Sequence, residues 1–352
     1  MIAEGGIIKM KYSFTRPKML HDATQGKKGH ALGIEILIFV LVFLVAQTLV
    51  SIPVTIASIA WMLFPDPETK ALMEQALRGK DMTTYSALAE QLAANQPDWL
   101  LLVQLFSTAL ATAVAILYCR LIERRSLVSM GIRRYGAIRE YLLGVPIGIA
   151  LISATVGICA SFGAVKLTPQ SFSLAPWILF LLGFLVQGMS EEVLCRGYMM
   201  VSVSRRHSLL LAVITNSMLF SLLHIFNPGF GLLPLINIIL FGILESIYVL
   251  RRGDLWGACA IHSIWNFFQG NVFGISVSGL GITTSPLRAT LDPSAAWLNG
   301  GSFGLEGGIA TTAVLTIACL ILIFLVPSKE DADEIIQNNN DLSPTAEEQK
   351  GI

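Results

Sequence analysis

The stretch Ser190–Gly197, with the sequence SEEVLCRG, places three charged side chains inside an otherwise apolar run. The run from Ala175 to Met200 is long enough to cross a bilayer, which takes about 20 apolar residues of an α-helix. A carboxylate at membrane depth costs at least about 2.5–3.5 kcal/mol on insertion scales. Two neighbouring glutamates in such a run therefore indicate a function, and buried chemistry is the first hypothesis.

The composition is also that of a membrane protein. Of 352 residues, 54% are hydrophobic and 14% charged, whereas soluble domains carry about 25% charged residues. All five cysteines lie in apolar runs, which favours small buried side chains over a disulfide framework. The sequence contains no P-loop, no glycine-rich nucleotide motif and no clustered Cys/His zinc pattern. We expect the lipid bilayer as a partner, and no nucleic acid.

Hydrophobic segments predict an all-α fold, a polytopic transmembrane bundle of about eight spans. Basic residues cluster before the first segment and after the second, fourth and sixth, which predicts that both termini are cytoplasmic and that the protein lies in the cell membrane. Pro53 is expected to bend or end the first span, because proline removes a backbone donor. The segments are 33–63, 98–119, 141–163, 175–203, 208–226, 232–250, 255–273 and 307–326.

The same patterns divide the chain into regions. Residues 1–30 form a basic cytoplasmic leader, expected at the membrane surface, and 327–352 a polar, acidic cytoplasmic tail. Residues 31–169 hold the N-terminal membrane helices, with an exposed outer loop at 66–97 that reads as one or two amphipathic helices. Residues 170–326 hold the core, in spans four to seven, and the last span. A Gly-, Ser- and Thr-rich outer loop, Phe273–Gly308, is expected to dip back into the protein.

Spacing within the acid motif separates two roles. Glu192 and Arg196 are four residues apart, hence on one helix face and able to form an ion pair. Glu191 points about 100° away, since an α-helix has 3.6 residues per turn. One acid is then neutralised while the other is left for chemistry. The competing interpretation is that the pair Glu192–Arg196 is purely structural.

Three further polar residues lie at depths that allow them to meet Glu191. Glu191 is fourteen residues before Arg205, and His224 is eighteen residues after Arg206, so both lie about 20–27 Å from this basic turn. His262 and Asn266 are four apart on a later span, so their side chains project together. An imidazole and a carboxamide side by side suit the stabilisation of an oxyanion.

Other polar residues in the spans have structural interpretations. Gln187, Asn237 and Glu245 are expected to make hydrogen bonds between helices. Glu35 lies near the cytoplasmic edge of the first span and is expected to reach the membrane surface with its carboxylate.

The three motifs together carry a resemblance to a known family. Glu191–Gly197 (EEVLCRG), Phe220–His224 (FSLLH) and His262–Asn266 (HSIWN) resemble the signature of the CPBP intramembrane endopeptidases, the type II CAAX prenyl protease and bacteriocin-processing (Abi) group. The glycine-rich stretch Asn299–Gly308 (NGGSFGLEGG) is also similar to bacterial members. The similarity covers about 170–326, and the ordered triple of motifs is more specific than any one of them.

The resemblance implies a membrane endopeptidase with named residue roles. Glu191 would be the general base that activates water, with His224 as its partner. His262 and Asn266 would polarise the scissile carbonyl and hold the oxyanion, and Glu192 with Arg196 would support the site. The substrate would be a membrane-associated peptide or protein, with or without a prenyl or other lipid group.

Metal dependence stays open at this stage. Glu191, His224 and His262 are three ligands that Zn²⁺ accepts, with water in the fourth position. A glutamate with two histidines also activates water without metal, and the absence of an H-E-x-x-H helix favours that version, which requires no cofactor.

Two rival functions remain on the sequence alone. One is a non-catalytic membrane immunity or scaffold protein that binds a peptide or partner in the same cavity. The other is a small transporter with Glu191 and His224 as a proton relay, although no inverted repeat supports it.

Overall fold

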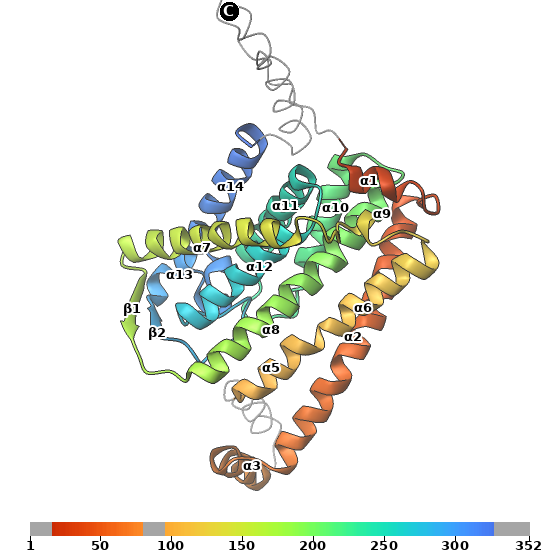
Figure 1. Ribbon diagram of the computed structural model, residues 1–352. Coiled ribbons are helices and arrows are strands. Elements are labelled where there is room, and N and C mark those ends of the chain that lie inside the picture. Colours follow the sequence, from red (N-terminus) through yellow and green to blue (C-terminus); the bar gives the residue numbers. More distant parts are fainter. Residues whose placement is uncertain (1–15, 80–95, 327–352) are drawn as a thin grey trace, which may run out of the picture.

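The computed structural model describes residues 16–79 and 96–326, which fold mostly as helices (Figure 1). At membrane depth a helix is favoured because it satisfies its backbone hydrogen bonds within one segment. Among the described residues, five helices are long and apolar enough to cross a membrane. They are α2 (Leu32–Leu63); α5 (Asp98–Ser107), α6 (Ala109–Leu117) and the π-helical η1 (Tyr118–Ile122) as one run; α7 (Ala137–Ser161); α8 (Leu174–Glu192), the π-helical η3 (Val193–Met200) and α9 (Val201–Ser204) as one run; and α11 (Leu232–Arg252).

Three other apolar helices are shorter than the sequence suggests. They are α10 (Leu209–Leu222), α14 (Ile309–Phe324) and α12 (Trp256–Phe267), which continues as the π-helical η4 (Phe268–Val272). The prediction of a span over 208–226 is wrong at its end, since α10 stops at Leu222 and His224 lies in the turn that follows. The polytopic helical class is confirmed, and the count of eight spans stays a prediction.

Helix α12 lies at the centre of the bundle. Every residue from Gly257 to Phe267 is buried, and the helix packs against α7, α8 and α11. Figure 1 shows α7 running across α12 and α8. Small residues permit this close approach: a side chain at Gly148 of α7 would lie 2.8 Å from the carbonyl oxygen of Ile261. The helix that carries His262 and Asn266 is therefore surrounded by protein.

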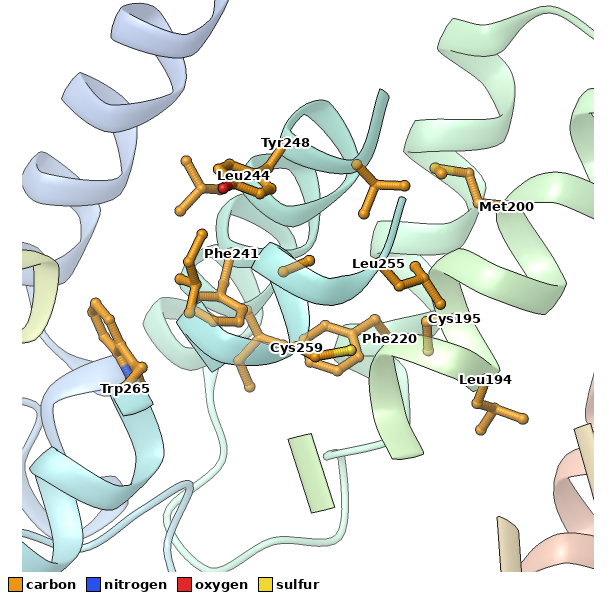
Figure 2. Close-up of a cluster of buried hydrophobic side chains, with 14 of the residues drawn as sticks. Leu194, Cys195, Met200, Phe220, Phe241, Leu244, Tyr248, Leu255, Cys259 and Trp265 are labelled. Atoms are coloured by element: carbon orange, nitrogen blue, oxygen red, sulfur yellow. The ribbon is translucent and has the colours of Figure 1, made fainter. Parts of the chain in front are cut away.

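An apolar cluster connects the helices around the site (Figure 2). Phe220 from α10, Phe241 from α11 and Trp265 from α12 lie in this cluster beside Cys195 and Cys259. Phe241 stacks obliquely on Trp265, with 5.5 Å between ring centroids. All five cysteines are buried and free, as predicted.

The first span differs from the expectation in two ways. Pro53 lies inside α2, which continues to Leu63, so the alternative in which proline ends the span is wrong. Glu35 does not extend to the membrane surface: it is 1% exposed, it accepts a hydrogen bond from the backbone N–H of His30 at 2.7 Å, and it lies 3.6 Å from Arg205. This carboxylate is buried because α2 packs near Arg205, a residue that is distant from it in sequence.

The described part of the leader is packed against the bundle. The short helix α1 (Lys18–Ala23) buries Met19, Leu20 and Ala23. The backbone carbonyl of Lys27 accepts a hydrogen bond from Arg205 at 2.7 Å. The predictions for residues 1–15 of the leader, for 80–95 of the outer loop and for the tail at 327–352 lie outside the described residues.

Residues 273–308 fold back onto the bundle and add a small sheet that the all-helical prediction lacks. Strand β1 (Val165–Pro169) pairs antiparallel with β2 (Leu287–Leu291), with Val165 opposite Leu291. Asn299 donates hydrogen bonds to the carbonyls of Ala164 and Asp292, both at 2.9 Å. The remaining short elements are α3 (Pro67–Gly79), η2 (Val128–Met130), η5 (Pro293–Ala295), α13 (Ala296–Asn299), η6 (Gly301–Phe303) and η7 (Leu305–Gly307).

Candidate active site

The two glutamates at the end of α8 face different surroundings. The side chain of Glu192 is fully buried, whereas that of Glu191 is 28% exposed and lines a cavity. Directly after Glu192 the helix widens into the π-helical η3, a feature that occurs frequently at functional sites. The separation of the two acids, expected from their 100° offset, is therefore present.

Glu192 holds Arg196 and His262 together. Its Oε1 accepts a hydrogen bond from Nη1 of Arg196 at 2.9 Å and lies 2.8 Å from Nδ1 of His262. Because an ionised carboxylate only accepts hydrogen bonds, Nδ1 of His262 carries the hydrogen. The ring orientation is thereby set, and Nε2 of His262 lies 3.6 Å from Oε2 of Glu191.

Gln187 connects Glu191 with Asn266. It lies one turn before Glu191 on α8 and donates from Nε2 to Oε1 of Glu191 at 2.6 Å. Its Oε1 accepts a hydrogen bond from Nδ2 of Asn266 at 3.0 Å. The other carboxylate oxygen of Glu191, Oε2, accepts no hydrogen bond from the described residues. The amide of Gln187 thus fixes the carboxylate and leaves one oxygen for a reactant.

His224 is held by the backbone of the preceding turn. Its Nδ1 lies 2.9 Å from the carbonyl oxygen of Phe220, so Nδ1 is the donor and Nε2 of the neutral ring is an acceptor. The ring of Phe220 packs edge-on against both His224 and His262, with centroids 5.1 and 5.9 Å apart, and the guanidinium of Arg196 lies 4.4 Å from its centre. Phe220 is thus the shared wall of both imidazoles.

Glu191, His224, His262 and Asn266 all line one cavity of about 260 Å³. The resemblance implied His224 as the partner of Glu191; in the structure the imidazole next to Glu191 is that of His262, and His224 faces the same cavity from the turn after α10. Besides Gln47 and Gln104, apolar side chains from α2, α5 and α8 line this cavity. They include Phe43, Leu101, Leu105, Phe180 and Phe184.

The candidate zinc ligands can be tested against this arrangement. Zinc sites gather three protein ligands around one point. Within residues 16–79 and 96–326, no three His, Cys, Asp or Glu side chains are grouped so that they could hold a metal ion. Glu191, His224 and His262 therefore do not form a zinc site as they are placed, and the chemistry below is assigned to the side chains alone.

Some polar residues that the sequence analysis treated as structural belong to the site or border it. Gln187 is one, and its signal in the sequence is its position four residues before Glu191 on an apolar helix. Glu245 was expected to make a hydrogen bond between helices, but it accepts none from the described residues and interacts electrostatically with Glu192 and Arg196. Asn237 makes the expected contacts, donating to the carbonyls of Glu306 and Gly308 at 2.7 and 2.8 Å.

Residues 173–268 match the family model described as type II CAAX prenyl endopeptidase Rce1-like. Over this segment the chain is similar to the Rce1-like family. The resemblance drawn from the three motifs is thus confirmed, and the Rce1-like segment contains Glu191, His224, His262 and Asn266. No curated protein matches the chain. The match to a protease family, together with the apolar helices, supports a membrane-embedded protease.

Proposed function

We propose that this protein is an intramembrane endopeptidase in which Glu191 activates water. The observation that supports this proposal most directly is the pairing of an oriented carboxylate with two imidazoles and a carboxamide on one cavity. Gln187 occupies one oxygen of Glu191, and Oε2 accepts no hydrogen bond from the described residues although it is buried. A carboxylate oxygen that accepts no other hydrogen bond is suited to take a proton from a water molecule.

The first step forms the tetrahedral intermediate. Oε2 of Glu191 accepts a proton from water while the water oxygen bonds to the scissile carbonyl carbon. The carbonyl oxygen becomes an oxyanion. Asn266 has a second N–H besides the one donated to Gln187, and we assign the second donor to Nε2 of His262 in its imidazolium form, whose Nδ1 is held by Glu192. Each such donor is worth about 2.7–4 kcal/mol in the transition state.

The second step breaks the peptide bond. The proton held by Glu191 passes to the leaving amine nitrogen as the C–N bond breaks, and the oxyanion returns to a carbonyl. In the same step the hydroxyl of the intermediate loses the second water proton to Nε2 of His224, which is an acceptor because Nδ1 donates to Phe220, and the acyl product leaves as a carboxylate. Glu192 and Arg196 position His262 throughout.

The substrate class follows from the cavity walls. The polar residues lie beside apolar surfaces of α2, α5 and α8, which fit a membrane-associated peptide or protein, with or without a lipid group. We place the protein in the cell membrane with both termini cytoplasmic, on the basis of the basic loops. Reporter fusions at Gln96 and Ser208 should report outside and inside, respectively, and an inverted pattern would contradict this orientation.

Cleavage by the purified protein tests the proposal. Internally quenched peptides, with and without a farnesyl group, are incubated with wild type and with Glu191→Gln in lipid nanodiscs. We expect wild type to cleave a subset of peptides and Glu191→Gln to cleave none at a comparable rate, since the proton acceptor is lost with little change of shape. A folded Glu191→Gln protein with wild-type activity would refute the role of Glu191. To find the natural substrates, membrane proteomes with and without the protein are compared, and uncleaved precursors should accumulate where the protein is absent.

A further inference from the structure

A second acidic side chain lines the cavity besides Glu191. Glu306, in η7 at the end of the glycine-rich stretch, lines the same cavity as Glu191. It is 8% exposed. The described residues that line this cavity include two glutamates and two histidines but no lysine and no arginine. The cavity wall is therefore acidic, and the mechanism above uses only one of its carboxylates.

Glu306 is held by neutral groups. Its carboxylate accepts hydrogen bonds from Nε2 of Gln269 and from Oγ of Ser278, the latter at 3.2 Å. The backbone N–H of Ser278 approaches it at 3.4 Å. Burial raises the pKa of this carboxyl group, and the hydrogen bonds from Gln269 and Ser278 oppose that shift. A buried carboxylate without a cationic neighbour is costly, and a cation brought by a substrate would offset part of that cost.

The residues around Glu306 are one helical turn from the catalytic ones. Gln269, its donor, follows Asn266 by three residues. Asn237, which binds its backbone carbonyl, precedes Phe241 by four residues of α11, about 6 Å, and Phe241 packs against His262 with 5.2 Å between centroids.

The third connection comes from the turn of His224. Asn227 follows His224 by three residues, and its Nδ2 donates to the carbonyl of Ser278 at 2.9 Å. The segment that holds Glu306 is thus fixed to the elements that carry Asn266, His262 and His224.

We propose that Glu306 forms a subsite for a positively charged side chain, lysine or arginine, close to the scissile bond of the peptide substrate. The inference rests on the proposed function, because it assumes that a peptide occupies the cavity. Lysine suits the geometry, since its charge is carried on a flexible four-carbon stem, and arginine offers a planar fork that matches a carboxylate. Desolvation inside the cavity strengthens the ion pair relative to one on the surface.

A binding experiment separates this inference from catalysis. Peptides are synthesised in sets that differ at one position, which holds lysine, arginine, norleucine or glutamate. Their affinities for the inactive Glu191→Gln protein and for the Glu191→Gln/Glu306→Gln double variant are measured in nanodiscs by fluorescence anisotropy. Glutamine at 306 keeps one oxygen, which accepts from Gln269 and from the backbone N–H of Ser278, but it removes the charge. Asp292→Asn in place of the Glu306 change is the matched control, because it removes a carboxylate from an exposed position of the same segment.

We expect one position at which lysine or arginine binds about 30-fold or more tightly than norleucine, as for a buried charge pair. That preference should disappear in the Glu306→Gln background and persist in the Asp292→Asn background. Equal affinity for lysine and norleucine at every position overturns the inference, whether or not Glu306→Gln folds. Cationic preference that survives Glu306→Gln also overturns it. If wild type cleaves peptides, the proposed function stands whether or not lysine is preferred. If the protein prefers lysine or arginine but cleaves no peptide, the proposed endopeptidase activity is refuted and the subsite at Glu306 stands.

Discussion

Glu123 and Glu191 are both carboxylates inside the helical bundle, but their surroundings differ. Glu123 is 2% exposed, and its oxygens accept hydrogen bonds from Arg125 at 2.6 Å, from Ser202 at 2.9 and 3.0 Å, and from Arg205. Glu191 accepts one hydrogen bond, from Gln187, and its other oxygen faces His262 across 3.6 Å on the wall of a cavity.

The two environments predict opposite consequences for a mutation. Removing the charge of Glu123 takes an ionised partner from Arg125 and leaves Arg205 with the more distant Glu35, so stability should fall. A polar group on the cavity wall interacts mainly with the reactant, so its removal leaves few protein groups without a partner. Stability should then change little, and activity should fall. Burial alone therefore does not identify a catalytic acid; we infer the catalytic role of Glu191 from an oxygen beside a cavity that accepts no hydrogen bond from the described residues.

The largest effect is expected for His224→Gln. The imidazole accepts a proton during the reaction, and the turn loses a single hydrogen bond to Phe220. The turnover number should fall by about 10²–10⁴-fold, as for other general acid–base residues. Initial rates on a cleaved peptide and a thermal unfolding curve measure both properties. A loss of stability with unchanged activity per folded molecule would assign His224 to the structure.

Glu123→Gln should show the reverse pattern. The free energy of unfolding should fall by about 3–5 kcal/mol, since two buried guanidinium groups lose an ionised partner. Activity per folded molecule should stay close to wild type. Denaturation in detergent measures the change, with Glu74→Gln on the exposed face of α3 as the control. An unchanged unfolding transition would show that the ion pairs around Glu123 are dispensable.

Asn266→Ala should leave residual activity. It removes one oxyanion donor and frees Gln187, which lowers the turnover number by about 10²–10³-fold. Asn216→Ala is the matched control, because this buried amide on α10 donates to Ser246 at 3.0 Å and takes no part in the proposed chemistry. Steady-state kinetics distinguish the two. An equal loss in both variants would mean that Asn266 acts through packing.

A small pH effect is expected at the start of α3, outside the membrane helices. Hydrogen bonds from Thr69 lower the pKa of Asp66 from 3.8 to about 2. A lowered folded pKa stabilises the helix start above pH about 4, and this contribution is lost as the pH falls toward 2. Hydrogen exchange of the peptide covering 64–79, corrected for intrinsic rates, should show weaker protection at pH 2.5 than at pH 5. Asp66→Asn should abolish the difference, and a retained difference would exclude Asp66 as its source.

The smallest effect is expected from metal removal. Since Glu191, His224 and His262 are not grouped around one point, chelator treatment should leave activity unchanged. Elemental analysis of purified, active protein accompanies the assay. Stoichiometric zinc that disappears in His224→Ala and in His262→Ala, with activity restored by zinc after chelation, would replace the metal-free mechanism.

The sequence by itself determined the helical membrane class and the order of the motifs. Hydropathy and the 3.6-residue period are properties of single segments, so they predicted the apolar helices, the pair Glu192–Arg196 and the separate direction of Glu191. Composition also predicted five buried, free cysteines. The glycine-rich stretch was visible as a motif, but its carboxylate Glu306 had no assigned position.

Only the tertiary structure decided which side chains meet. His262, not His224, lies beside Glu191, because α12 packs between α7, α8 and α11 through small residues. Gln187 connects Glu191 with Asn266, and Glu35 lies in the interior beside Arg205. These contacts join residues that are 71 or more positions apart, apart from the single-turn pair Gln187–Glu191. Which side chains meet depends on how whole helices pack against one another, and the residue periodicity of a single helix contains no information about that packing.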